Sequence, residues 1–145
     1  MLEIKCKMAP GAEDLLPVKA HADDAAFDLR ASIGMTVPPR MPTLVPTGLF
    51  LELPTGYEAQ VRPRSGLAVK KAVTVLNTPG TVDAGYRGEV KVILFNAGSE
   101  DFPIARGDSI AQMVIQKLPE VVLVPADELS DSDRGAGGFG STGKN

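Results

Sequence analysis

The segment GTVDAGYRGEVKVILFN, residues 80–96, contains the two patterns that indicate the fold class. Its first half carries Gly80, Gly85 and Gly88, and glycines so closely spaced mark tight turns. Its second half, EVKVILFN, begins with polar and apolar residues in alternation, which is typical of a β-strand with one buried face. The segment therefore predicts a turn-rich loop that leads into a strand.

Turn-forming glycines and prolines also occur along the rest of the chain. The 145 residues include 12 prolines and 15 glycines, which rarely leave a window long enough for a helix. Short apolar runs, most of them rich in Val and Ile, lie between these residues: 2–8, 49–53, 58–61, 72–76, 89–95, 109–118 and 121–124. Many short strands separated by turns predict an all-β sandwich or barrel.

One short helix is predicted within this pattern. Ser65 can cap GLAVKK, residues 66–71, because a serine hydroxyl accepts a hydrogen bond from a free N–H group of the first helical turn. Lys70 and Lys71 lie near the C-terminal end, where the helix dipole favours cations. This arrangement would place Arg64 and Ser65 at a helix N-terminus, a natural position for phosphate.

The composition excludes several classes of protein. Hydrophobic residues make up 43% and charged residues 23%, as in a globular protein of one domain. The net charge of −3 argues against a nucleic-acid partner, although a small anionic ligand needs only a few local cations. One cysteine and one histidine leave no internal disulfide and no Cys/His zinc set. We expect no membrane partner and a cytoplasmic location, because the chain has neither a membrane-length apolar run nor a secretory signal.

The loop of the opening segment carries the clearest candidate for chemistry. Asp83 can act as a general base if it holds a water within hydrogen-bond reach. Tyr86 can offer a flat face to a sugar. The plainer alternative is that Asp83 is a turn residue bonded to its own backbone, and this segment alone favours that alternative.

Three further segments carry polar residues that also have a plain explanation. Arg64 and Ser65, in RPRSGLAVK, fit a solvated turn that leads into a helix. Asp28, in AAFDLRAS, fits a strand residue that faces outward. Gln112, in GDSIAQMVI, fits a core glutamine whose amide is satisfied, or a residue at the rim of a strand. Each segment taken singly is therefore ambiguous.

The last twelve residues, RGAGGFGSTGKN (134–145), are unusual because five of them are glycine. Such a stretch buries little apolar surface, so the plain alternative is a disordered terminus. It also carries a cation (Arg134), a ring (Phe139) and two hydroxyls (Ser141 and Thr142), which are groups that a nucleoside phosphate can use. We therefore predict a tail that becomes ordered over a nucleotide.

Taken in order, these segments resemble the five motifs of the homotrimeric deoxyuridine triphosphatases (dUTPases), from about residue 25 to residue 143. The first motif has Phe27 where the family usually carries tyrosine. The residues that carry the resemblance are Asp28; Arg64, Ser65 and Gly66; Gly80, Asp83, Tyr86 and Gly88; Gly107, Asp108, Ile110, Ala111 and Gln112; and the run RGAGGFGSTG, 134–143.

The resemblance implies a jelly-roll-like β-barrel over residues 1–130, with one short helix, and a mobile glycine-rich tail over residues 131–145. It implies a dUTP diphosphatase that hydrolyses dUTP to dUMP and pyrophosphate with Mg²⁺ as cofactor. Such an enzyme limits uracil incorporation into DNA and supplies dUMP for dTMP synthesis. It also implies a homotrimer with shared active sites, in which one chain supplies the phosphate contacts, a second a hairpin at 77–86 and a third the tail.

The resemblance further implies a role for each site residue. Asp83 would orient and deprotonate the attacking water, Tyr86 would pack under the deoxyribose, and Asn77 would read the edge of the uracil. Asp28 would act on Mg²⁺ through coordinated water. The other substrate-binding residues would be Arg64, Ser65, Gly66 and Gln112 at the phosphates; Arg134, Ser141 and Thr142 at the β- and γ-phosphates; Phe139 stacked on uracil; and Gly140.

Two alternatives remain beside this interpretation. dCTP deaminases share the fold but place a catalytic Glu in the strand after the Asp-x-Gly-aromatic turn, where this chain has Ile93. Deamination needs a group that transfers protons, and an isoleucine cannot do so. The other alternative is a trimer that binds nucleotides without catalysis, against which the presence of both Asp83 and Arg134 argues.

Overall fold

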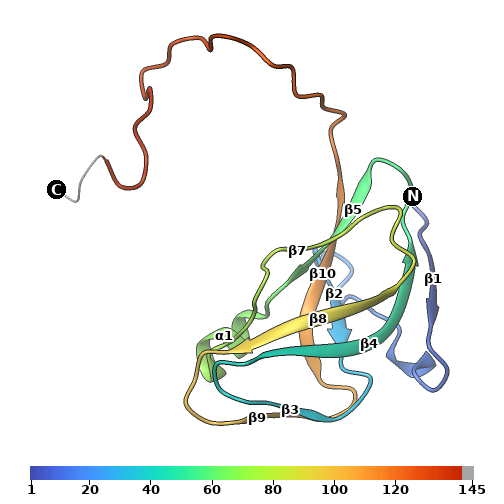
Figure 1. The fold of residues 1–145 in the computed structure, drawn as a ribbon. Coiled ribbons are helices and arrows are strands. Elements are labelled where there is room, and N and C mark those ends of the chain that lie inside the picture. Colours follow the sequence, from blue (N-terminus) through green and yellow to red (C-terminus); the bar gives the residue numbers. More distant parts are fainter. Residues whose placement is uncertain (142–145) are drawn as a thin grey trace.

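The computed structural model describes residues 1–141, and the strands between Lys5 and Lys117 form β-sheets around one hydrophobic core (Figure 1). The expected all-β class with one short α-helix is confirmed. In chain order the elements are β1 (Lys5–Met8), the 3₁₀ helix η1 (Glu13–Leu15), β2 (Phe27–Arg30), β3 (Met35–Val37), β4 (Pro42–Glu52), β5 (Tyr57–Arg62), α1 (Ser65–Lys71), β6 (Val73–Val75), β7 (Gly80–Val82), β8 (Glu89–Asn96), β9 (Phe102–Ile104) and β10 (Ser109–Lys117).

The strands interleave in space in a jelly-roll-like arrangement. One sheet has the order β1-β4-β8-β6, a second has the order β2-β10-β5-β7, and β3 pairs with β9. Each of these strand pairs is antiparallel. Among residues 1–141 the strands form separate sheets rather than one continuously hydrogen-bonded barrel. Neighbouring strands are mostly distant in sequence, so residues from far-apart segments meet.

Strand β8 shows why the opening segment indicates the fold. Its alternation is confirmed: Val90, Val92 and Leu94 are at most 1% exposed, and Lys91 between them is exposed. Burying side chains of this size stabilises the fold by about 1.5–3 kcal/mol each relative to exposure. β8 lies between β4 and β6 in its sheet. The loop at residues 83–88, which carries Asp83 and Tyr86, leads directly into this buried strand.

Helix α1 is present, but it begins one residue earlier than the sequence predicts. Ser65 is the first helical residue, Arg64 occupies the N-cap position, and no side chain caps the helix. The expectation that Ser65 caps the helix is therefore wrong, because its backbone has already turned into the helix. Lys70 and Lys71 do lie in the last turn, as predicted.

The segment that contains Asp83 and Tyr86 is a loop between two sheets. β7 pairs with β5 in one sheet, and β8 pairs with β4 and β6 in the other. The hairpin expected at 77–86 is therefore not a strand pair of its own, because its strand β7 joins β5 instead. The prediction that Asp83 and Tyr86 lie on a loop is confirmed.

The strand expected at residues 121–124 is absent. The last strand, β10, ends at Lys117, and residues 118–141 form no helix or strand. Figure 1 shows this segment leaving the sheets and extending far beyond them. The four apolar side chains at 121–124 are 76–94% exposed. Their apolar composition favours a strand, but no strand within residues 1–141 pairs with them.

An exposed ion pair fastens η1 to the turn before β10. Two nitrogens of Arg106 donate to the Asp14 carboxylate at 2.6 and 3.1 Å, and one of them also donates to the Gly11 carbonyl at 2.7 Å. The hydrogen bond from Arg106 lowers the pKa of Asp14, and the same bond raises the pKa of Arg106.

In the described part of the chain, no helix is long and apolar enough to cross a membrane.

Candidate active site

Three of the predicted site residues line one cavity. Asn77, Asp83 and Tyr86 border a space of about 490 Å³ beside strand β8. Asn77 precedes β7, whereas Asp83 and Tyr86 follow it. The remaining lining residues are Leu44, Thr81, Val82, Glu89, Val90, Lys91 and Ile93. The cavity thus combines a carboxylate, an amide and an aromatic ring on a partly apolar wall, which suits a nucleoside.

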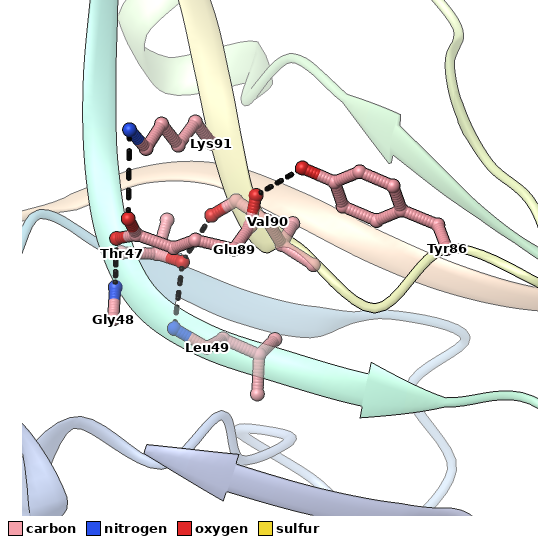
Figure 2. Close-up of polar contacts among 7 residues, drawn as sticks. All are labelled: Thr47, Gly48, Leu49, Tyr86, Glu89, Val90 and Lys91. Atoms are coloured by element: carbon pink, nitrogen blue, oxygen red, sulfur yellow. Dashed lines mark hydrogen bonds and ion pairs between the residues drawn. The ribbon is translucent and has the colours of Figure 1, made fainter. Parts of the chain in front are cut away.

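Local hydrogen bonds hold the loop that carries Asp83 and Tyr86. The backbone N–H of Tyr86 donates to the Asp83 carbonyl at 3.0 Å. The Tyr86 hydroxyl donates to the Glu89 carbonyl at 2.9 Å (Figure 2). Arg87 donates to the carbonyls of Ala84 and Tyr86 at 2.7 and 3.1 Å. The loop is therefore closed on itself and on the start of β8. The carboxylate of Asp83 is exposed to solvent and can meet a ligand.

A second group of predicted residues gathers where β2, β10 and β5 lie side by side. Gln112 on β10 is directly opposite Asp28 on β2 and Arg62 on β5. Nε of Arg64 lies 3.7 Å from the Asp28 carboxylate, and the Gln112 amide donates to the Pro63 carbonyl at 2.9 Å. The sheet register thus brings together three motifs that are far apart in sequence.

Arg64 is also anchored from a second side. Its guanidinium donates to the Ser109 carbonyl at 3.0 Å, which fixes the side chain against β10. Ser65 and Gly66 follow it at the exposed start of α1. A cation, a hydroxyl and free helical N–H groups therefore lie side by side, and these are donors that suit phosphate oxygens.

The described tail residues, 131–141, do not reach either group. Arg134 donates to the Gly137 carbonyl at 2.7 Å and forms a local turn, and Phe139 is fully exposed. Gly140 and Ser141 are also exposed, and Gly140 has a positive φ of 78°. Thr142 lies outside the described residues.

The cavity of Asp83 and the donors around Arg64 are separate in one chain. A smaller cavity of about 270 Å³ borders Asp28 and Gln112, and none of its lining residues borders the cavity of Asp83. Over residues 1–141, no three His, Cys, Asp or Glu side chains are grouped as a metal cage would require. Asp28 remains a carboxylate that can hold a hard cation through water.

Comparison with known proteins assigns the family. A family model described as dUTPase matches residues 13–143. The chain belongs to the dUTPase family. The deoxyuridine 5'-triphosphate nucleotidohydrolase of Gloeothece citriformis (strain PCC 7424) is 56% identical over 129 residues, which are 89% of each chain.

Solved dUTPase structures share the fold. A dUTPase variant of Staphylococcus bacteriophage 80alpha, solved with dUpNHpp, superposes with a TM-score of 0.87 at 23% identity and covers 99% of this chain and 100% of its own. A dUTPase variant of phage phi11 of S. aureus, described as revealing the coordination of a structural Mg(II) ion, has a TM-score of 0.77 at 20% identity. It covers 88% of this chain and 98% of its own.

Three residues around Tyr86 are not among those predicted from the sequence. Glu89 and Lys91 line the same cavity, and Thr47 lies buried behind them. Glu89 and Lys91 alternate with the buried valines of β8, so the alternation could have placed both on the cavity side. Nothing local marks Thr47, because its role depends on the pairing of β4 with β8.

Proposed function

We propose that this member of the dUTPase family is a dUTP diphosphatase, which hydrolyses dUTP to dUMP and pyrophosphate. The observation that carries the proposal is the cavity in which Asp83, Tyr86 and Asn77 meet. Further support is the 56% identity to a named deoxyuridine 5'-triphosphate nucleotidohydrolase. The cellular consequence is that uracil is kept out of DNA and dUMP is supplied for dTMP synthesis.

In the proposed reaction, Asp83 orients a water and takes its proton while the water oxygen attacks the α-phosphorus. The bond from the α-phosphorus to the bridging oxygen breaks, and pyrophosphate leaves. Tyr86 packs against the deoxyribose and excludes a 2'-hydroxyl, and Asn77 reads the uracil edge. Asp83 suits its role because its carboxylate is exposed on a loop that hydrogen bonds hold in place.

The phosphates are held by Arg64, Ser65, Gly66 and Gln112. Support comes from the anchored guanidinium of Arg64 and the free donors at the start of α1. Mg²⁺ bound to the triphosphate supplies charge neutralisation. Asp28 suits such an ion because Mg²⁺ keeps most of its waters, and one carboxylate can hold such a water without a protein cage.

We also propose that the chain works as a barrel, residues 1–130, and a tail, residues 131–145, that covers the nucleotide. Phe139 stacks on uracil, and the tail closes over the phosphates so that bulk water is excluded. The exposed ring of Phe139 and the run of glycines support this role, because both leave the tail free to rearrange. The other tail residues in the proposal are Arg134, Gly140, Ser141 and Thr142.

A homotrimer with shared active sites completes the proposal. Over residues 1–141, the cavity of Asp83, the donors around Arg64 and the tail lie apart, so each site needs more than one copy. The exposed apolar residues at 121–124 support association, because exposed apolar side chains are stabilised when another copy covers them. Light scattering should therefore give three times the mass of one chain.

The deciding experiment measures products from dUTP, dCTP, dTTP and UTP with Mg²⁺. We expect pyrophosphate from dUTP and little from the other three. Release of ammonia from dCTP, or no reaction with dUTP, would refute the proposal. Ile93 argues against a deaminase. Its hydrocarbon side chain borders the cavity at the position where a deaminase needs a carboxylate. Glu89 also borders the cavity, but its carboxylate is bound to Gly48 and Lys91.

A further inference from the structure

Strand β4 contains a bulge opposite the start of β8. Pro46 pairs with Lys91 and Leu49 pairs with Val90, so Thr47 and Gly48 have no partner in the strand ladder. Gly48 has a φ of 75°, and a Cβ on it would lie 2.7 Å from the Cβ of Ala12. Only glycine fits there without strain, and the bulge is therefore a built feature of the fold.

Side chains replace the ladder bonds that the bulge removes (Figure 2). Thr47 is 2% exposed, and its hydroxyl donates to the Val90 carbonyl and accepts the Leu49 N–H at 3.2 Å. The Glu89 carboxylate accepts the Gly48 N–H at 2.8 Å. Its other oxygen lies 3.6 Å from Nζ of Lys91. Without Glu89, the Gly48 N–H would lose its hydrogen-bond partner in the bulge.

The same residue also contacts the loop of the active site. The backbone carbonyl of Glu89 accepts the Tyr86 hydroxyl at 2.9 Å, as Figure 2 shows. Glu89 is thus held by its side chain to β4 and by its carbonyl to Tyr86. A Cβ on Gly88 would lie 2.4 Å from the Tyr86 hydroxyl oxygen, so the ring already fits tightly over the backbone before Glu89.

We infer that Glu89 is a positioning residue: its carboxylate, anchored on Gly48, sets the position of its own carbonyl and thereby of the Tyr86 ring. The inference rests on the proposed function, in which this ring packs against deoxyribose. Removing the Glu89 carboxylate releases the first residue of β8 from Gly48. The Glu89 carbonyl is then no longer fixed, and it no longer holds the Tyr86 ring in place. Discrimination between dUTP and UTP should suffer most, because it depends on how closely the ring meets the sugar.

The test compares Glu89→Ala with Glu89→Gln and with Tyr86→Phe. In Glu89→Ala we expect kcat/KM for dUTP to fall about ten-fold and the dUTP-to-UTP preference to narrow by a similar factor. Glu89→Gln should keep most of the kcat/KM for dUTP and most of the dUTP-to-UTP preference, because its amide oxygen can still accept the Gly48 N–H. Glu52→Ala is the matched control, since it removes a carboxylate on the neighbouring strand β4 whose ion-pair partner is an exposed lysine, Lys5.

A double-mutant cycle separates positioning from simple stability. Tyr86→Phe removes the hydroxyl that binds the Glu89 carbonyl, so Glu89→Ala should then have little further effect on the dUTP-to-UTP preference. Additive effects of the two changes would overturn the inference, as would an unchanged preference in Glu89→Ala. If Glu89→Ala does not fold, Glu89→Asp takes its place, because it keeps the charge but shortens the reach to Gly48.

A second measurement does not depend on activity. The chain has two tyrosines and no tryptophan, so Tyr57→Phe leaves Tyr86 as the sole strong fluorophore. In that background we expect Glu89→Ala to increase acrylamide quenching of Tyr86, and Glu52→Ala to leave it unchanged. Equal quenching in both would refute the positioning role. An inactive wild type would refute only the proposed function, because the quenching still reports on Tyr86.

Discussion

Gly88 provides a direct test of how much the Tyr86 ring matters. A Cβ on Gly88 would lie 2.4 Å from the Tyr86 hydroxyl oxygen, 2.5 Å from Cζ and 2.9 Å from Cε2. The backbone of Gly88 has no positive φ, so alanine meets no conformational strain there. The change Gly88→Ala therefore acts through the ring alone.

The required displacement follows from these distances. Ordinary contact begins at 3.4 Å, so the hydroxyl oxygen must retreat from 2.4 Å by about 1 Å. Tyr86 is 47% exposed, and the ring can move into solvent without disturbing the core. A retreat of that size breaks the 2.9 Å bond to the Glu89 carbonyl. Loss of this bond lowers the free energy of unfolding by about 1 kcal/mol.

Catalysis should suffer far more than stability. A misplacement of about 1 Å in a positioning group can cost about 100-fold in rate. We expect kcat/KM for dUTP to fall by about that factor in Gly88→Ala, whereas the thermal midpoint falls by only about 2–4 °C. Gly85→Ala is the matched control from the same loop, because a Cβ there meets nothing within 4 Å.

The measurements are steady-state kinetics with dUTP and UTP and thermal unfolding. Both are made on wild type, Gly88→Ala and Gly85→Ala. Near-normal kcat/KM in Gly88→Ala would show that the ring does not need its position. A variant that fails to fold would contradict the argument that the ring can move freely into solvent. An equal loss in Gly85→Ala would assign the effect to the backbone of the loop.

Three further outcomes are expected. Asp83→Asn should abolish dUTP hydrolysis but spare nucleotide binding in calorimetry, and near-normal turnover would exclude Asp83 as the base. Removal of the chain from Arg134 onward should leave the fold unchanged in circular dichroism and activity very low, whereas full activity would refute the covering role of the tail. The hydrogen bond from Arg106 lowers the folded-state pKa of Asp14 below 3.8, so the pair stabilises the fold above about pH 4 and loses this effect as the pH falls through the lowered pKa. The thermal midpoints of wild type and Asp14→Asn should therefore differ near pH 7 and converge once the pH falls below the lowered pKa of Asp14, and a gap that persists there would contradict this.

Local patterns were sufficient for the fold class and for placing Asp83 and Tyr86 on a loop. Glycines and prolines are read locally, because they restrict or free the backbone wherever they stand. The alternation in β8 is also local, since it records which side of one strand is buried. Both Asp83 and Tyr86 could therefore be placed on a loop beside a strand before any contact was known. The order of the motifs was enough to suggest the family.

The assembly of the site could not be predicted from those patterns. Gln112 meets Asp28 and Arg62 only because of the register of β10 with β2 and β5. The support of the Tyr86 loop depends on Gly48, whose N–H has no partner in the strand ladder because of a bulge in β4 and donates to Glu89 instead. Register and bulges follow from how whole strands fit around a shared core, and no short window of sequence contains that information.

Residues 121–124 show the same limit from the other side. Their composition alone favours a strand. In the structure their side chains are exposed, and residues 118–141 form no strand. A strand needs a partner for its backbone groups, and partners are a property of the folded arrangement rather than of the segment. The amino-acid sequence thus specifies which groups are present and which backbone shapes they prefer. The packed sheets decide which of these groups meet, because pairing depends on contacts between residues far apart in the chain.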